Sequence, residues 1–222
     1  MQEEAAKFYQ HLEYLNVFKP YLDAKAYNDV VSQALRKTLA DPFFHGRRIR
    51  VLDCGTGTGR GLIRLIKDGF LRNAYIEAFD VDRDLLMGMP RLFEEHAVLN
   101  GWSYKPLDCK DPANFQFSIT CEKEGIDIVV HGFVCSVYDI GSEILLEEVD
   151  LVIGQAFIEH VNSQLAYGRL LGLLKSGGFV YFSMNCDGWF CYTPCPRGSE
   201  DRDTKIMNLF NDLAMNDQNY GN

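Results

Sequence analysis

Three alternating glycines, Gly55, Gly57 and Gly59, stand directly after a short apolar run that includes Asp53 near its end. Glycine lets a ligand approach the backbone closely, and the free N–H groups at the start of a following helix attract an anionic group. The chemistry expected here is therefore the binding of a nucleotide-like or cofactor-like molecule at the carboxyl end of a strand.

The spacing of these glycines departs from two common phosphate-binding patterns. The dinucleotide pattern G-x-G-x-x-G would need glycine at position 60, or glycine or alanine at position 62, where the chain has Arg60 and Leu62. A P-loop would need a Gly-Lys pair, which the sequence lacks. A nicotinamide-dependent oxidoreductase is therefore disfavoured, and a glycine-rich turn that binds nothing is the other alternative.

Strands and helices alternate around this turn, as the hydrophobic pattern predicts. Five near-continuously apolar runs predict buried strands, at 49–52, 75–79, 126–134, 149–154 and 179–184. Helices are expected from the glycines to Gly69, at 84–99 with a bend at Pro90, and at 161–174. This alternation predicts an α/β fold with a mostly parallel sheet and helices on both faces.

Helical periodicity marks the start of the chain as well. Residues 1–46 are expected to form a helical cap, and residues 47–222 the α/β domain. A helix at about 23–39 is expected to turn Val30 and Leu35 inward, toward the core or toward the ligand site.

The composition of the 222-residue chain is globular, with 47% hydrophobic and 24% charged residues. Its net charge of −9 repels phosphate backbones, so nucleic acid is a disfavoured partner. No run approaches the ~20 apolar residues of a membrane span, and the first residues lack a secretory signal pattern. Seven cysteines without a C-x-x-C pair fit a reducing, cytoplasmic location.

The segment 51–59, VLDCGTGTG, resembles motif I of the class I S-adenosylmethionine-dependent methyltransferases. Three further segments resemble landmarks of that family in the same order: 77–82 at the second strand, 149–157 at the fourth strand, and 173–179 at the turn into the fifth. The resemblance covers about residues 48–186. It implies a Rossmann-like sheet that binds S-adenosylmethionine and transfers its methyl group.

The resemblance also implies roles for single residues. The glycines and Asp53 would bind the amino acid end of the donor, Asp80 the ribose hydroxyls, and Val81 one face of the adenine. Asp82 is the alternative ribose ligand, or else a helix cap. The expected donor-binding set is Asp53, Gly55, Thr56, Gly57, Gly59, Arg60, Asp80, Val81, Phe133, Val134, Gln155 and Phe157.

Two registers are open for the third strand, whose end usually supplies an acid to the adenine in that family. Asp108 ends one candidate, whereas the other, 126–134, ends in Phe133 and Val134. A short connection to the fourth strand favours the second register. Residues 102–125 are then an insertion, and Phe133 takes the place of the acid.

Methyl transfer needs in-line geometry and, for an oxygen or nitrogen nucleophile, often a base. Glu159 and His160 follow the fourth strand and are the candidate bases, with a surface position as the alternative for His160. Trp189 and Phe190 follow the fifth strand, and Tyr14 lies near the start of the chain; these aromatic residues are candidates for substrate contact. The expected substrate is a small molecule.

The end of the sequence lacks one feature that the resemblance implies. The family's sheet continues after the fifth strand with a helix and an antiparallel hairpin, but the chain ends just after a helix expected at about 201–215. An incomplete sheet exposes an edge, which favours self-association.

The cysteines at 186, 191 and 195 lack metal-ligand spacing, so no metal is expected. A non-catalytic donor-binding module of a larger assembly is the alternative function.

Overall fold

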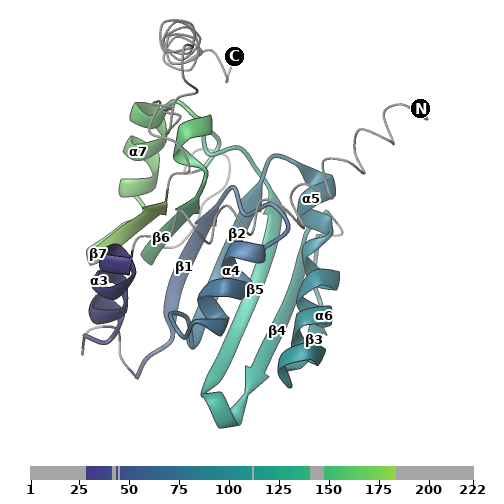
Figure 1. Cartoon of the computed structure of the whole chain (residues 1–222). Helices are drawn as coiled ribbons and strands as arrows, with labels where there is room; N and C mark the ends of the chain where they lie inside the picture. The colour runs from purple at the N-terminus through teal and green to yellow at the C-terminus, as the bar shows by residue number, and fades with distance from the viewer. Residues whose placement is uncertain (1–28, 42–43, 45, 112, 141–147, 184–222) are drawn as a thin grey trace, which may run out of the picture.

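A strand-rich α/β structure occupies the middle of the chain (Figure 1). The computed structural model describes residues 29–41, 44, 46–111, 113–140 and 148–183. The strands are β1 (Ile49–Cys54), β2 (Asn73–Asp80), β3 (Ser103–Leu107), β4 (Phe115–Cys121), β5 (Ile126–Val134), β6 (Val149–Gln155) and β7 (Leu174–Ser183). The helices are α3 (Asp29–Leu39), α4 (Arg60–Lys67), α5 (Arg83–Met87), α6 (Met89–Asn100) and α7 (Ser163–Leu171), with 3-10 turns η2 (Glu122–Glu124) and η3 (Ile158–His160).

All seven strands belong to one sheet, in the order β3-β4-β5-β2-β1-β6-β7. The five strands from β5 to β7 in this order are parallel, whereas β3 and β4 are antiparallel to their neighbours. This arrangement confirms the predicted Rossmann-like, mostly parallel sheet. Because these five strands are parallel, their carboxyl ends lie along one side of the sheet.

The third parallel strand is β5, which pairs with β2 so that Phe79 lies opposite Phe133 and Asp80 opposite Val134. The register that ends in Phe133 and Val134 is therefore confirmed. The segment before it forms the hairpin of β3 and β4, which extends the sheet beyond β5. Asp108 follows β3 at the outer side of this hairpin, three strands away from β2.

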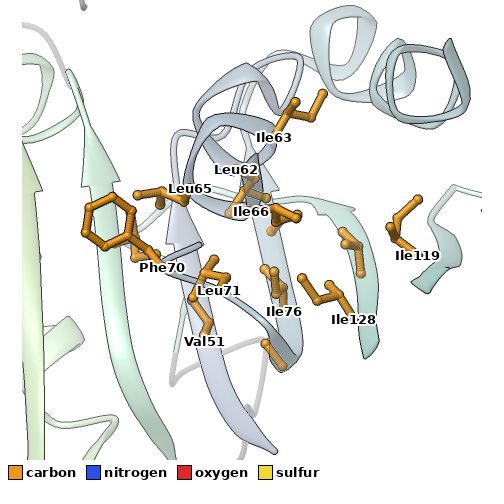
Figure 2. Packing of buried hydrophobic residues seen from close by; sticks show 14 of the residues in the cluster. Val51, Leu62, Ile63, Leu65, Ile66, Phe70, Leu71, Ile76, Ile119 and Ile128 are labelled. Carbon is orange, nitrogen blue, oxygen red and sulfur yellow. The ribbon is translucent and has the colours of Figure 1, made fainter. Parts of the chain in front are cut away.

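Hydrophobic clusters cover the two faces of the sheet, because successive side chains of a strand point to opposite faces. On one face, α4 contributes Leu62 and Ile66 to a cluster with Val51 of β1 (Figure 2). On the other face, α7 contributes Leu170 to a cluster with Leu52. Helices on both faces were predicted, and the structure confirms them.

The region expected to form one helix at 84–99 contains two helices instead. The first, α5, ends at Met87, Gly88 separates it from α6, and Pro90 stands in the first turn of α6. Proline suits a first turn because the N–H that it lacks would have no partner within the helix. Pro90 therefore marks the start of a helix and does not bend one.

Residues 172–178 also differ from the prediction. The helix ends at Leu171 and β7 begins at Leu174, several residues before the expected strand. The pairing of β6 with β7 is irregular between Val149 and Leu151, and Gly177 has a φ of +83° in this stretch. An early strand start with a bulge explains why the glycines looked like a turn in the sequence.

The first described helix, α3, packs at the end of α4 that is remote from the three glycines. Leu35 is buried in the same cluster as Val51, as predicted, but Val30 is 75% exposed, and its predicted inward orientation is wrong. Arg36 donates a hydrogen bond to the carbonyl of Asp68, just after α4. The described helix thus does not cover the glycines, and the domain boundary at residue 46 stays a prediction.

Candidate functional site

The turn from β1 into α4 has the left-handed backbone that glycine permits. The φ angles are +63° at Gly55, +54° at Gly57 and +79° at Gly59. A methyl group added at Gly55 would lie 2.6 Å from the Phe157 ring, and one at Gly59 would lie 2.8 Å from Met89, but one at Gly57 would meet no atom within 4 Å. The glycine loop, residues 55–59, is therefore closed on two sides and open at its middle.

Asp80, the last residue of β2, holds this loop directly. Its Oδ2 accepts the N–H of Gly57 at 2.7 Å, and its Oδ1 accepts the N–H of Asp82 at 2.9 Å. Burial raises the pKa of the Asp80 carboxyl, while these N–H groups oppose the rise. The structure thus brings together the two elements that the sequence placed at one edge of the sheet.

Asp82, the alternative ribose ligand, forms hydrogen bonds with the start of the following helix. Its carboxylate accepts the N–H groups of Asp84 at 3.0 Å and Leu85 at 3.1 Å, and so caps α5. This confirms the interpretation of Asp82 as a helix cap.

Asp53 lies beneath the loop and is only 3% exposed. Burial raises the pKa of its carboxyl to about 7; the Thr56 side chain opposes this rise, and the charge of Asp80 adds to it. A buried carboxyl with a pKa near 7 can hold a proton, or release it when a cation approaches.

Two exposed valines flank Asp80. Val81 is 70% exposed and Val134, opposite Asp80 in the register, is 36% exposed. The ring of Phe133 is instead buried in the second cluster and stacks on Phe79 at 6.1 Å between centroids. Contact of Phe133 with an adenine stays a prediction, and its ring is already occupied by core contacts.

The end of β6 approaches the glycine loop from the other side. A methyl group added at Gly61 would lie 2.4 Å from Nε2 of Gln155, so the amide of Gln155 lies against the start of α4. Phe157 lies against Gly55 in the same way. The structure therefore places both predicted residues beside the loop.

Two residues of this site were missed in the sequence. Ala156 has a φ of +49°, a strained value for a residue with a Cβ, while its N–H donates to the carbonyl of Ser183 at 2.8 Å. Cys135 donates its N–H to the carbonyl of Asp80 at 3.0 Å. Neither residue type marks such a position in a sequence, so nothing could have pointed to them.

The candidate bases lie in η3, just after Phe157. His160 is exposed, whereas Glu159 is half-buried, with its Oε2 atom shielded from solvent. Arg60 opens α4 and is half-buried, and burial lowers its pKa against the opposing charge of Glu95. The roles of these residues stay predictions.

Several predicted features lie outside the described residues: Tyr14, Trp189, Phe190 and the cysteines at 186, 191 and 195. Within the described ranges, no three His, Cys, Asp or Glu side chains gather in a way that could hold a metal ion. No helix in those ranges combines the length and apolar character needed to cross a bilayer.

Comparisons with known proteins give structural matches only, since no family model and no curated protein sequence matches the chain. A candidate S-adenosyl-L-methionine-dependent methyltransferase from Methanococcus maripaludis is 14% identical, over 69% of this chain and 57% of its own, with a TM-score of 0.41. The plantazolicin methyltransferase BpumL, crystallised with SAH, is 13% identical over 99% of this chain and 64% of its own, with a TM-score of 0.44.

The [4+2]-cyclase SpnF is a third similar structure, 14% identical over 68% of this chain and 43% of its own, with a TM-score of 0.42. This chain spans about half the length of the first structures that it matches. At these values the similarity concerns the fold, and the function depends on the site itself.

Proposed function

We propose that the chain binds S-adenosylmethionine at the glycine loop and transfers its methyl group to an oxygen or nitrogen atom of a small molecule. The observation that carries this proposal is the 2.7 Å hydrogen bond from the Gly57 N–H to Asp80 Oδ2. This hydrogen bond joins the open glycine turn to an acid at the end of the neighbouring strand. The donor would need the turn for its amino acid end and the acid for its ribose.

The amino acid end of the donor fits the loop. The loop is open at Gly57, so a carboxylate can approach backbone N–H groups at the start of α4. Asp53, with a pKa raised to about 7 by burial, would ionise beside the donor's ammonium group. The two charges of this end thus have complementary groups on one turn.

The adenosyl end fits the edge formed by β2 and β5. Each oxygen of Asp80 accepts one backbone N–H, and a carboxylate has about four acceptor positions, which leaves capacity for two ribose hydroxyls. The exposed side chains of Val81 and Val134 offer apolar contact to the adenine.

When bound, the donor supplies a methyl group on a positively charged sulfur, which a nucleophile displaces in line. The chain contributes orientation and the exclusion of water. Gln155 and Phe157 form the wall of the site nearest the glycines. Glu159 and His160, in η3 after β6, would accept the proton that an oxygen or nitrogen nucleophile loses.

The proposed substrate is a small molecule, because a net charge of −9 disfavours nucleic acid. Two further proposals accompany it. One is a cytoplasmic location. The other is self-association at β7, which pairs with β6 alone among the described strands.

Isothermal titration with S-adenosylmethionine and S-adenosylhomocysteine tests donor binding. Asp80→Asn is expected to weaken both ligands at least about tenfold, because it removes a charged acceptor. Asp82→Asn is the matched control: asparagine also caps helices, so affinity should stay within about twofold. Failure of the unaltered protein to bind either ligand would reject the proposal.

Turnover is measured separately, with donor carrying a labelled methyl group and a broad panel of small acceptors. Transfer to an oxygen or nitrogen atom supports the proposed enzyme. Donor binding without transfer to any acceptor would favour the alternative, a non-catalytic donor-binding module.

A further inference from the structure

A cavity lies where β1 and β2 begin, at the opposite ends of the strands from the glycine loop. Its volume is about 420 Å³, and its wall includes the starts of β1 and β2, the turn after α4, and the last turn of α3. Such a volume is within the range of small-ligand sites, about 300–1,000 Å³. The strands begin here and end at the glycine loop, so the two sites are separated by the length of β1.

The cavity wall contains three arginines, although the protein is acidic overall. Its described lining includes Arg36, Arg47 and Arg72, and contains no aspartate or glutamate. The chain as a whole has a net charge of −9. A concentration of guanidinium groups against this background attracts an anion.

The three arginines differ in how their charges are balanced. Arg47 donates two hydrogen bonds, of 3.0 and 2.9 Å, to the fully buried Asp150, and Arg72 donates one of 3.2 Å to Glu124. Arg36 donates to the carbonyl of Asp68 at 2.9 Å and has no carboxylate partner among the described residues. Arg36 therefore has donors and charge available for a ligand.

Apolar groups form the rest of the wall. The guanidinium of Arg36 lies 4.4 Å from the centre of the Phe70 ring, and that of Arg47 lies 5.6 Å from the centre of the Phe44 ring. Both rings are over nine-tenths buried, and Leu39 lies beside them in the lining. Stacking on a ring restricts a guanidinium to one plane, which suits it for recognition of a planar anion.

We propose that this cavity binds a small organic carboxylate with an apolar body. Arg36 forms charge-assisted hydrogen bonds with the carboxylate, and the wall of Phe44, Phe70 and Leu39 contacts the body of the ligand. A doubly charged phosphate would bring an excess of charge into a wall that is largely apolar, so the monoanion is the better match.

Titration with 3-phenylpropanoate, and with the neutral 3-phenylpropanamide of the same shape, tests the charge requirement. The anion should bind saturably, and the amide at least about tenfold more weakly. Arg36→Gln should weaken the anion by at least about tenfold. Arg91→Gln is the matched control, since Arg91 is exposed on α6 and pairs with Glu95; it should leave affinity unchanged.

A second variant tests the location without altering charge. Ala40 is exposed and lines the cavity, so Ala40→Trp should fill space there and weaken the anion at least about fivefold while the protein still folds. Circular dichroism confirms the fold of each variant. Saturating S-adenosylhomocysteine should not displace the anion, because that ligand is proposed to bind at the glycine loop, at the other end of β1.

Any of five results would overturn this inference: no saturable binding of the anion up to about 10 mM, equal affinity for the amide, unchanged affinity in Arg36→Gln, unchanged affinity in Ala40→Trp, or displacement by S-adenosylhomocysteine. The Arg36 and Ala40 variants decide the matter whether or not the protein binds S-adenosylhomocysteine. Anion binding at the cavity can therefore be disproved while the proposed methyltransferase activity is supported. Equally, the methyltransferase proposal can be disproved while anion binding is supported.

Discussion

The two ends of β1 present opposite chemistry. At the carboxyl end, Asp80 accepts the N–H of Gly57 in the glycine turn, and Asp53 is buried near it. At the other end, Arg36 and Arg47 surround a cavity with aromatic walls. Asp80 accepts two backbone N–H groups and Asp53 is deeply buried, whereas Arg47 pairs with the Asp150 side chain and Arg36 lies over the Phe70 ring. One end thus depends on backbone hydrogen bonds and burial of acids, and the other on ion pairs and ring contacts of arginines, so the two ends should respond differently to substitution.

The largest expected effect concerns the arginine end. Asp150→Ala removes a fully buried carboxylate that accepts two hydrogen bonds from Arg47 and one from the Arg50 N–H, and should lower the free energy of unfolding by about 3–5 kcal/mol. Denaturant unfolding measures this loss. Asp127→Ala, which removes an exposed partner of Arg48, is the control and should cost at most about 1 kcal/mol. Equal losses would show that burial of the pair is unimportant.

At the acid end, Asp53 should make the free energy of unfolding depend on pH. Burial raises the pKa of Asp53 from 3.8 to about 7, so between these values the folded protein holds a proton that the unfolded chain has lost. Stability should therefore fall as pH rises from about 4 to about 7, by up to about 4 kcal/mol from this group. Above pH 7 its contribution is constant.

Asp53→Asn isolates that contribution. The difference in unfolding free energy between the variant and the unaltered protein should grow in favour of the variant over the same pH window. Urea unfolding at several pH values provides the measurement. A difference independent of pH would contradict the raised pKa of Asp53.

A smaller effect is expected from the backbone of the glycine loop. Gly55→Ala puts a Cβ at a φ of +63° and 2.6 Å from the Phe157 ring, so it should cost about 2–3 kcal/mol and abolish donor binding. Gly101→Ala has a similar φ of +71° but open space around it. This control should cost about 1 kcal/mol and leave donor binding intact. Thermal unfolding and donor titration of both variants make the comparison.

The smallest effect has the opposite sign. Ala156→Gly relieves the strain of a φ of +49° and should raise stability by about 0.5 kcal/mol, because part of the gain is offset by the added freedom of the unfolded chain. Ala34→Gly, on the exposed side of α3, should instead lower stability by about 0.5–1 kcal/mol. Loss of stability in both variants would mean that Ala156 is not strained.

The same contrast explains what the sequence could predict. The glycine loop and Asp80 were predictable, because a strand, a turn and the next strand end follow one another in the chain. The register of β5 was predictable from a short connection. The arginine cavity was not, since Arg36, Arg47 and Arg72 share no spacing and meet only through α3, β1 and the turn after α4.

Other differences have local causes. The break at Gly88 was missed because proline in a first turn looks the same in a sequence as proline in a bend. Val30 matched an apolar helical face, yet it lies one turn beyond the part of α3 that reaches the core at Leu35. Periodicity predicts which side of a helix is apolar, but not how much of its length meets the sheet.

The hairpin of β3 and β4 affects how a strand of another chain could pair with this sheet. It makes β3 the outermost of the described strands on its side, and β3 exposes Lys105 and Pro106. Proline has no amide proton to donate to an incoming strand, and the lysine side chain would be partly dehydrated by it. Pairing of β3 with a strand of another chain is therefore disfavoured. β7, the outer strand on the other side among the described strands, contains no proline, so the two outer strands differ in the backbone donors that they carry.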